Sequence, residues 1–159
     1  MERGEDFGSI WYALSLLNLD APNLDLLYPL ISLTFFALLA YYLLKLPNLP
    51  NLAAVALFAV VIFTTLSKVY SPQYVLWLTP LAVIALQNSR QLITFWFWQG
   101  CEIIYHLAIW QYLALFSTAQ FGLPAGGYAI ASLLRVLGVS IFTYRLMRDL
   151  SAPSTGRKD

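Results

Sequence analysis

Charged residues are scarce in this sequence of 159 residues, because Asp, Glu, Lys and Arg together make up only 11% of it. A soluble domain carries roughly twice that fraction. Apolar and aromatic residues make up 60% of the chain, and its mean hydropathy is +0.68. This balance excludes an ordinary water-soluble domain and predicts an all-α, polytopic integral membrane helix bundle.

Cysteine and histidine are nearly absent, with one residue of each. The single Cys101 excludes an intrachain disulfide, and one histidine offers too few ligands for a metal site, so no metal is expected. A net charge of +1 provides no basic patch, and no nucleic-acid partner is expected. Glycine-rich phosphate loops and the common catalytic motifs are missing too, and no cofactor is predicted.

Apolar runs separated by polar or proline-containing turns predict about five transmembrane spans within residues 24–147. A helix rises about 1.5 Å per residue, so a bilayer core of roughly 30 Å requires about 20 residues. The second and third runs are short, and they either cross the membrane twice or form a re-entrant hairpin. The expected spans are residues 24–46, 52–67, 75–86, 92–117 and 125–147.

The two ends of the chain are more polar than the spans. Residues 1–23 are expected to form an outer-face loop with a short interfacial helix, for which Ser9 is a suitable N-cap. Residues 148–159 contain charged residues, a proline and a glycine, and are expected to be a disordered cytoplasmic tail.

Lysine and arginine residues predict the orientation. Lys45, Arg90, Arg145 and the basic residues of 148–159 share one side if every span crosses, and this side is cytoplasmic by the positive-inside rule. We therefore expect a multi-pass protein of the cell membrane, in contact with membrane lipids. Its C-terminus would be cytoplasmic, and the segment Lys68–Tyr74 would lie toward the outer face.

The segment Lys68–Tyr74 interrupts the apolar pattern between the second and third runs. It combines an ammonium, hydroxyls and an amide around a turn-forming proline, and these groups suit a phosphate and a sugar. A charge at membrane depth indicates a functional site, whereas the alternative is a turn whose lysine reaches the headgroups. The candidate binding residues are Lys68, Tyr70, Ser71, Gln73 and Tyr74.

Glu102, His106 and Arg135 form a second candidate, an intramembrane polar cluster. Glu102 and His106 are four residues apart and share a helix face. Arg135 lies at a similar depth in the next, antiparallel span, so Glu102 and Arg135 are expected to meet. The pair is either a structural salt bridge or a proton relay or substrate contact. In the same span, Gly127 and Ala131 have the small-xxx-small spacing that predicts close helix packing.

The run SKVYSPQYVLWLTPL, residues 67–81, resembles a signature of the family 87 glycosyltransferases, which are polyprenol-phosphate-sugar-dependent membrane mannosyltransferases and their actinobacterial relatives. The stretches ERG (residues 2–4) and GSIWY (residues 8–12) are similar to the Arg-Gly and Gly-Ser-x-Trp stretch of that family. The resemblance covers most of the chain.

The resemblance implies a type C glycosyltransferase fold and transfer of a sugar, mannose in the family, from a polyprenyl phosphate donor to an acceptor on the extracytoplasmic face. Lys68 would face the lipid phosphate, and Ser71, Gln73 and Tyr74 would shape the donor pocket. The family's catalytic base is an Asp in an early outer loop that no Asp of this chain matches, so no catalytic residue is expected here.

By this resemblance the chain is expected to be the C-terminal half of such an enzyme, inactive alone. Its partner would be the missing N-terminal half or another membrane subunit. The alternative is a small non-enzymatic membrane assembly or transport subunit that uses Glu102, His106 and Arg135.

Overall fold

The computed structural model describes residues 5–48, 50–117 and 119–151, and all regular secondary structure in this part of the chain is helical, without a strand. The predicted all-α class is therefore confirmed. The elements are α1 (Ile10–Ser15), α2 (Leu24–Lys45), α3 (Leu52–Leu66), the 3₁₀ helix η1 (Pro72–Tyr74), α4 (Val75–Ala85), α5 (Ser89–Phe116) and α6 (Ala125–Ser151).

The expected number of five spans is not matched, because only α2 and α6 among the described helices are both long and apolar enough to cross a membrane. α5 has 28 residues, but its Gln, Tyr, His and Glu side chains lower its hydropathy. α3 and α4, with 15 and 11 residues, reach only about 22 Å and about 16 Å. The two long apolar helices favour a membrane protein.

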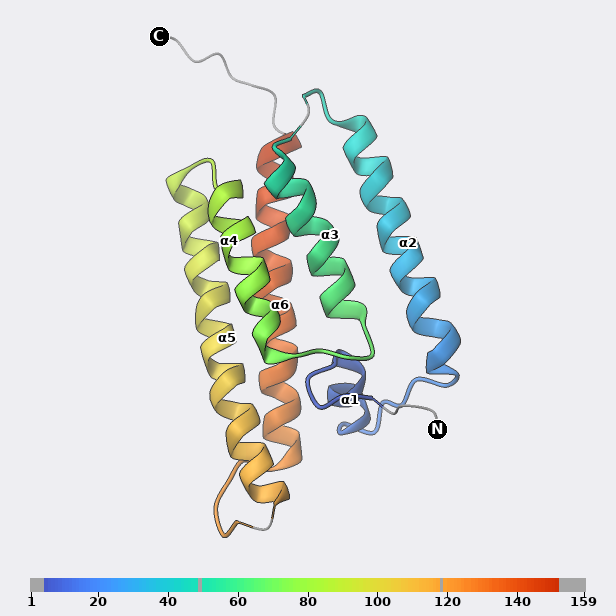
Figure 1. Cartoon of the computed structure of the whole chain (residues 1–159), viewed down its shortest axis with the longest axis vertical. Coiled ribbons are helices and arrows are strands. Elements are labelled where there is room, and N and C mark those ends of the chain that lie inside the picture. The colour runs from blue at the N-terminus through green and yellow to red at the C-terminus, as the bar shows by residue number, and fades with distance from the viewer. Residues whose placement is uncertain (1–4, 49, 118, 152–159) are drawn as a thin grey trace.

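Successive long helices run in opposite directions along the bundle (Figure 1). One end therefore collects the C-terminal ends of α2 and α6 and the N-terminal ends of α3 and α5. Lys45, Arg90 and Arg145 belong to these helix ends, as the sequence predicted. The connection between α3 and α4 lies part-way along α5 and α6, because α3 and α4 are so short (Figure 1).

α1 is the short helix that the sequence predicted, and the Ser9 hydroxyl accepts a hydrogen bond from the Tyr12 amide at 3.1 Å. One face of α1 packs against the protein. Trp11 and Ala13 are buried in protein, and the Trp11 indole donates to the Leu66 carbonyl at 2.8 Å. α1 packs against α6 beyond the end of α3, in the space that the short α3 leaves open (Figure 1).

α5 begins earlier and α6 ends later than the sequence predicted. The expected turn at residues 87–91 contains an N-cap, in which the Asn88 side chain accepts from the Gln91 amide at 3.1 Å. Asp149 accepts hydrogen bonds from Asn88 at 3.1 Å and Gln91 at 2.9 Å, which holds the last turn of α6. The first four residues of the expected tail are therefore helical, and residues 152–159 lie outside the described chain.

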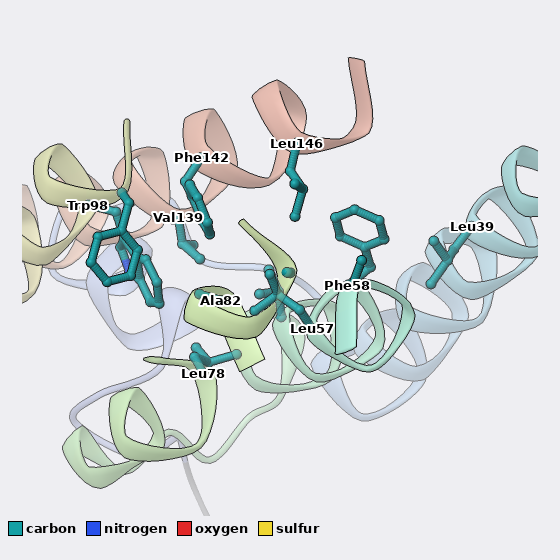
Figure 2. Packing of buried hydrophobic residues seen from close by; sticks show 13 residues of the cluster. Leu39, Leu57, Phe58, Leu78, Ala82, Trp98, Val139, Phe142 and Leu146 are labelled. Carbon is teal, nitrogen blue, oxygen red and sulfur yellow. The ribbon is translucent and has the colours of Figure 1, made fainter. Parts of the chain in front are cut away.

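The main core lies where α3, α4, α5 and α6 meet. Trp98 of α5 and Phe142 of α6 stack with ring centroids 5.4 Å apart and planes 12° apart. Leu57 of α3 and Ala82 of α4 are buried beside these rings (Figure 2). Such close packing holds helices together in a membrane, where lipid is as apolar as the side chains.

The close contact between α5 and α6 lies at Gly138, not at the predicted Gly127. A Cβ atom at Gly127 would meet Leu123, from the turn before α6, at 2.8 Å. A Cβ atom at Gly138 would lie 3.0 Å from the Cys101 sulfur on α5 and 3.3 Å from the Trp98 Cα. The small residue that lets these helices approach is therefore Gly138, and Ala131 is buried as expected.

Gly138→Val is expected to lower the free energy of unfolding by about 1–3 kcal/mol, because its methyl groups would overpack the contact with Cys101. Gly100→Val is the matched control on α5, since a Cβ atom there meets nothing within 4 Å. Thermal unfolding of the purified chain in detergent measures both effects. Equal unfolding temperatures for the two variants would contradict the assignment.

Candidate functional site

The segment Lys68–Tyr74 links α3 to α4 through a short turn. The Ser67 hydroxyl accepts from the Val69 amide at 3.2 Å just after α3 ends. Pro72 is the first residue of η1, where its missing N–H is not needed. The Tyr74 amide then donates to the Ser71 carbonyl at 2.9 Å, and α4 follows directly. Local turn chemistry therefore holds the segment between the two apolar helices.

Lys68 forms an ion pair with Asp25 in the first turn of α2. The Lys68 side chain is 18% exposed and that of Asp25 is 66% exposed. The ammonium also lies 6.0 Å from the centre of the Tyr28 ring. An anionic ligand at Lys68 would share the ammonium with Asp25 or displace this carboxylate. Sequence reasoning missed Asp25 as a partner because the two residues are 43 positions apart.

Tyr70, one of the predicted binding residues, is buried. Its ring covers the guanidinium of Arg135, whose Cζ lies 3.4 Å from the ring centre. Burial raises the pKa of Tyr70 to about 12, although the charge of Arg135 opposes this shift, so the phenol is neutral near pH 7. Tyr70 therefore anchors the segment to α6 through a cation–π contact.

Ser71, Gln73 and Tyr74 form the accessible part of the segment. Gln73 is exposed, and Ser71 and Tyr74 are partly exposed. No hydrogen bond engages the Ser71 hydroxyl or the Gln73 amide within the described residues. The Tyr74 ring lies 4.9 Å from that of Trp77, so an aromatic surface adjoins these polar groups. Donor groups and an aromatic platform are therefore close together on one short segment.

Arg135 is buried at 2% exposure and joins three parts of the chain. In addition to Tyr70, its Cζ lies 4.6 Å from the centre of the Tyr105 ring of α5, and Nη2 donates to the Gly8 carbonyl at 3.1 Å. The expected ion pair with Glu102 is absent at 4.0 Å among the described residues. Nη2 is the guanidinium nitrogen that donates to Gly8, whereas Nε and Nη1 are buried without a hydrogen-bond partner.

Glu102 and His106 share one face of α5, as predicted. The His106 Nδ1 lies 2.7 Å from the Glu102 backbone carbonyl and 4.0 Å from its carboxylate Oε2. The Trp98 indole donates to Glu102 Oε1 at 3.0 Å, whereas Oε2 has no hydrogen-bond partner. The structure thus brings Glu102 and His106 together and directs Arg135 to the Lys68–Tyr74 segment.

One of two cavities adjoins Glu102 and His106, and the candidate site residues do not line the other. A cavity of 220 Å³ between α4 and α5 is lined by Val75, Gln99, Glu102, Ile103, His106 and Leu107. A larger, mainly apolar cavity of 450 Å³ lies between α2, α3 and α6, with α1 at its edge. Among the described residues, no three His, Cys, Asp or Glu side chains gather as metal ligands would. No protein family, curated protein or solved structure matches this chain.

Proposed function

We propose that the chain is the donor-binding membrane part of a glycosyltransferase that uses a polyprenyl phosphate sugar. The observation that carries this proposal is the Lys68 ammonium on the same recessed turn as the unengaged Ser71 hydroxyl and Gln73 amide. An ammonium and neutral donors together suit a phosphate, and the Tyr74–Trp77 rings suit a sugar face or a lipid headgroup.

The proposed chemistry is a single displacement at the anomeric carbon of the donor sugar. The acceptor hydroxyl forms the new C–O bond, the bond from carbon to phosphate oxygen breaks, and a carboxylate not assigned in this chain takes the hydroxyl proton. Lys68 would stabilise the negative charge of the departing phosphate. Its ion pair with Asp25 holds the ammonium in place before a phosphate arrives.

The proposed membrane arrangement has α2 and α6 crossing the cell membrane, with α3 and α4 as a re-entrant hairpin. α5 is less apolar but would cross beside α6, because its 28 residues are long enough and its Glu102, Tyr105 and Tyr112 side chains are buried in the bundle. The lengths of α3 and α4, about 22 Å and about 16 Å, fall short of a bilayer core of roughly 30 Å. The end with Lys45, Arg90 and Arg145 would be cytoplasmic. Lys68 would then lie recessed from the outer face.

Lys68→Ala is expected to lower binding of a photoreactive polyprenyl phosphate mannose by about tenfold or more. A hydrogen bond from a charged group contributes about 1.5–3 kcal/mol, and 1.4 kcal/mol is tenfold in affinity. Asp25→Asn should instead raise binding, because it removes the carboxylate that competes for Lys68. The measurement is photo-labelling of the full chain in lipid nanodiscs, titrated with the probe.

Lys45→Ala is the matched control, since Lys45 ends α2 at the opposite end of the bundle and lies 5.6 Å from the Tyr41 ring. It should bind the probe as the unmodified chain does. Equal labelling of the Lys68→Ala variant and the unmodified chain would refute the proposal, as would an equal loss in the Lys45→Ala control.

A second function, a non-enzymatic assembly or transport subunit, is favoured by one observation. The unpartnered Glu102 Oε2 lines a cavity between α4 and α5, where no part of the Lys68 ion pair lies. Glu102→Gln separates the two functions. Loss of assembly or transport with unchanged binding of the polyprenyl phosphate probe would support this second function.

A further inference from the structure

We propose that Glu102 and His106 form a proton-binding pair, which takes up a proton from the cavity between α4 and α5. The proposal rests on the geometry of this cavity and holds for either function above. It assigns a ligand, the proton, to a buried group that the donor-binding segment does not use.

The cavity connects the buried carboxylate with the outer surface of the bundle. Glu102 is only 3% exposed, yet it lines the cavity, and its Oε2 has no hydrogen-bond partner. The His106 side chain, at 35% exposure, lines the same cavity closer to the surface. Ile103 and Leu107, 62% and 65% exposed, form its apolar rim. His106 therefore lies between Glu102 and the surface of the bundle, on the path that a proton would take to the carboxylate.

The hydrogen bond of His106 identifies its basic nitrogen. A carbonyl oxygen only accepts, so the 2.7 Å contact with the Glu102 carbonyl places the imidazole proton on Nδ1. Nε2 is then the free base of the neutral ring. An added proton forms an N–H bond at Nε2 or an O–H bond at Glu102 Oε2. The net charge of the pair rises by one in both cases.

The surroundings of Glu102 favour uptake of a proton. α4 contributes no titratable side chain, and Gln99 donates to Thr79 at 3.2 Å rather than to the carboxylate. An ionised carboxylate with one oxygen away from water and without a donor is costly. The charged or titratable groups that face Glu102, besides His106, are Arg135 from α6, Cys101 of α5 and Tyr70 of the Lys68–Tyr74 segment.

Arg135 is the group that opposes protonation, because its positive charge favours an ionised Glu102. Its Nη2 donates to the Gly8 carbonyl and the rings of Tyr70 and Tyr105 cover the guanidinium, whereas Nε and Nη1 have no hydrogen-bond partner. No ion pair joins Arg135 to Glu102 within 4.0 Å among the described residues. Arg135 therefore acts on Glu102 as a nearby charge and not through a direct salt bridge, which leaves the carboxylate able to take up a proton through His106.

Dicyclohexylcarbodiimide tests the proposal, since this apolar reagent modifies a protonated carboxyl group and leaves an ionised one. The full chain in lipid nanodiscs is treated between pH 5 and pH 9, and the modified residues are identified by mass spectrometry. Glu102 should be modified at least tenfold more at the acidic end of this range than at the basic end. The exposed Asp20 is the internal control, a carboxyl group outside the cavity whose modification is compared with that of Glu102 at each pH.

His106→Leu tests the partner. A positive charge on His106 favours the ionised carboxylate, so removal of the imidazole should let Glu102 stay protonated, and reactive, to a higher pH. An unmodified Glu102 at every pH would overturn the proposal, because the carboxylate would then be the ionised counter-charge of Arg135. An unchanged pH midpoint in the folded His106→Leu variant would overturn the role of His106. The chain without a substitution is enough to decide whether Glu102 takes up a proton. Neither result depends on binding of the polyprenyl phosphate probe.

Discussion

Arg135→Met is expected to lower the free energy of unfolding by about 3 kcal/mol and to release the Lys68–Tyr74 segment from the bundle. A charged hydrogen bond contributes about 1.5–3 kcal/mol, and a desolvated cation–π contact adds about 0.5–2 kcal/mol. Arg135 makes one such bond to the Gly8 carbonyl and one such contact with the Tyr70 ring. Methionine has a similar length, so the loss reflects the contacts rather than a large cavity.

Thermal unfolding in detergent measures the global effect, and hydrogen exchange of the amides near Gly8 and Tyr70 measures the release of the segment. Arg145→Met is the matched control, because Arg145 pairs with Asp149 at 3.6 Å at the end of α6, where both side chains are partly exposed. Such a pair contributes about 0–1 kcal/mol. Similar losses in the two variants would show that burial of Arg135 confers no special stability.

Gly8→Ala is expected to be about as damaging as the loss of Arg135, although it adds only a methyl group. The new Cβ atom would lie 2.4 Å from the Tyr70 carbonyl oxygen and 2.8 Å from the Tyr105 hydroxyl. The first of these atoms belongs to the backbone, so the N-terminal turn or the Lys68–Tyr74 segment must move. Overpacking of this kind costs about 1–3 kcal/mol and occasionally more.

Gly100→Ala is the control for this substitution, since nothing lies within 4 Å of a Cβ atom at Gly100. Alanine in place of a mid-helix glycine stabilises by about 1 kcal/mol. The two alanine variants should therefore change the unfolding temperature in opposite directions. A Gly8→Ala variant as stable as the unmodified chain would show that the turn is not packed against Tyr70 as described.

The stability losses of Arg135→Met and Gly8→Ala should also be coupled. Gly8 and Arg135 both hold the N-terminal turn against the Tyr70 ring. Once one of these contacts is lost, the turn is already loosened, and loss of the second contact lowers the free energy of unfolding by less. Stability changes at residues that share a partner do not add. The double variant should therefore lose less stability than the sum of the two single losses.

The helices could be predicted from the sequence because their signals are local. Apolar runs bounded by proline and asparagine turns gave α2, α3 and α4 to within one residue at each end. Ser9 was recognised as a cap from its position before an amphipathic stretch. The sequence pattern predicts a turn at Asn88 and Gln91, because polar residues look alike in a turn and in a cap. Their helical role depends on Asp149, which the sequence does not place beside them.

The sequence predicts which residues belong to the candidate site but not which residues they contact. Lys68, Tyr70, Glu102 and Arg135 are conspicuous as polar groups within apolar runs. Their partners were not predictable, because the sequence gives the depth of a residue along its helix and not the direction in which its side chain points. Similar depth suggested an ion pair between Glu102 and Arg135, and the structure instead directs the guanidinium to Tyr70.

The sequence by itself determined the helical class, the short lengths of α3 and α4 and the placement of basic residues near one end of the bundle, since each depends on residues close together in the chain. Only the tertiary structure decided that Asp25 meets Lys68 and that Gly8 meets Arg135, across separations of 43 and 127 residues. These pairings depend on how helices rotate and cross when they pack. That geometry results from the contacts of the whole bundle, not from any one segment.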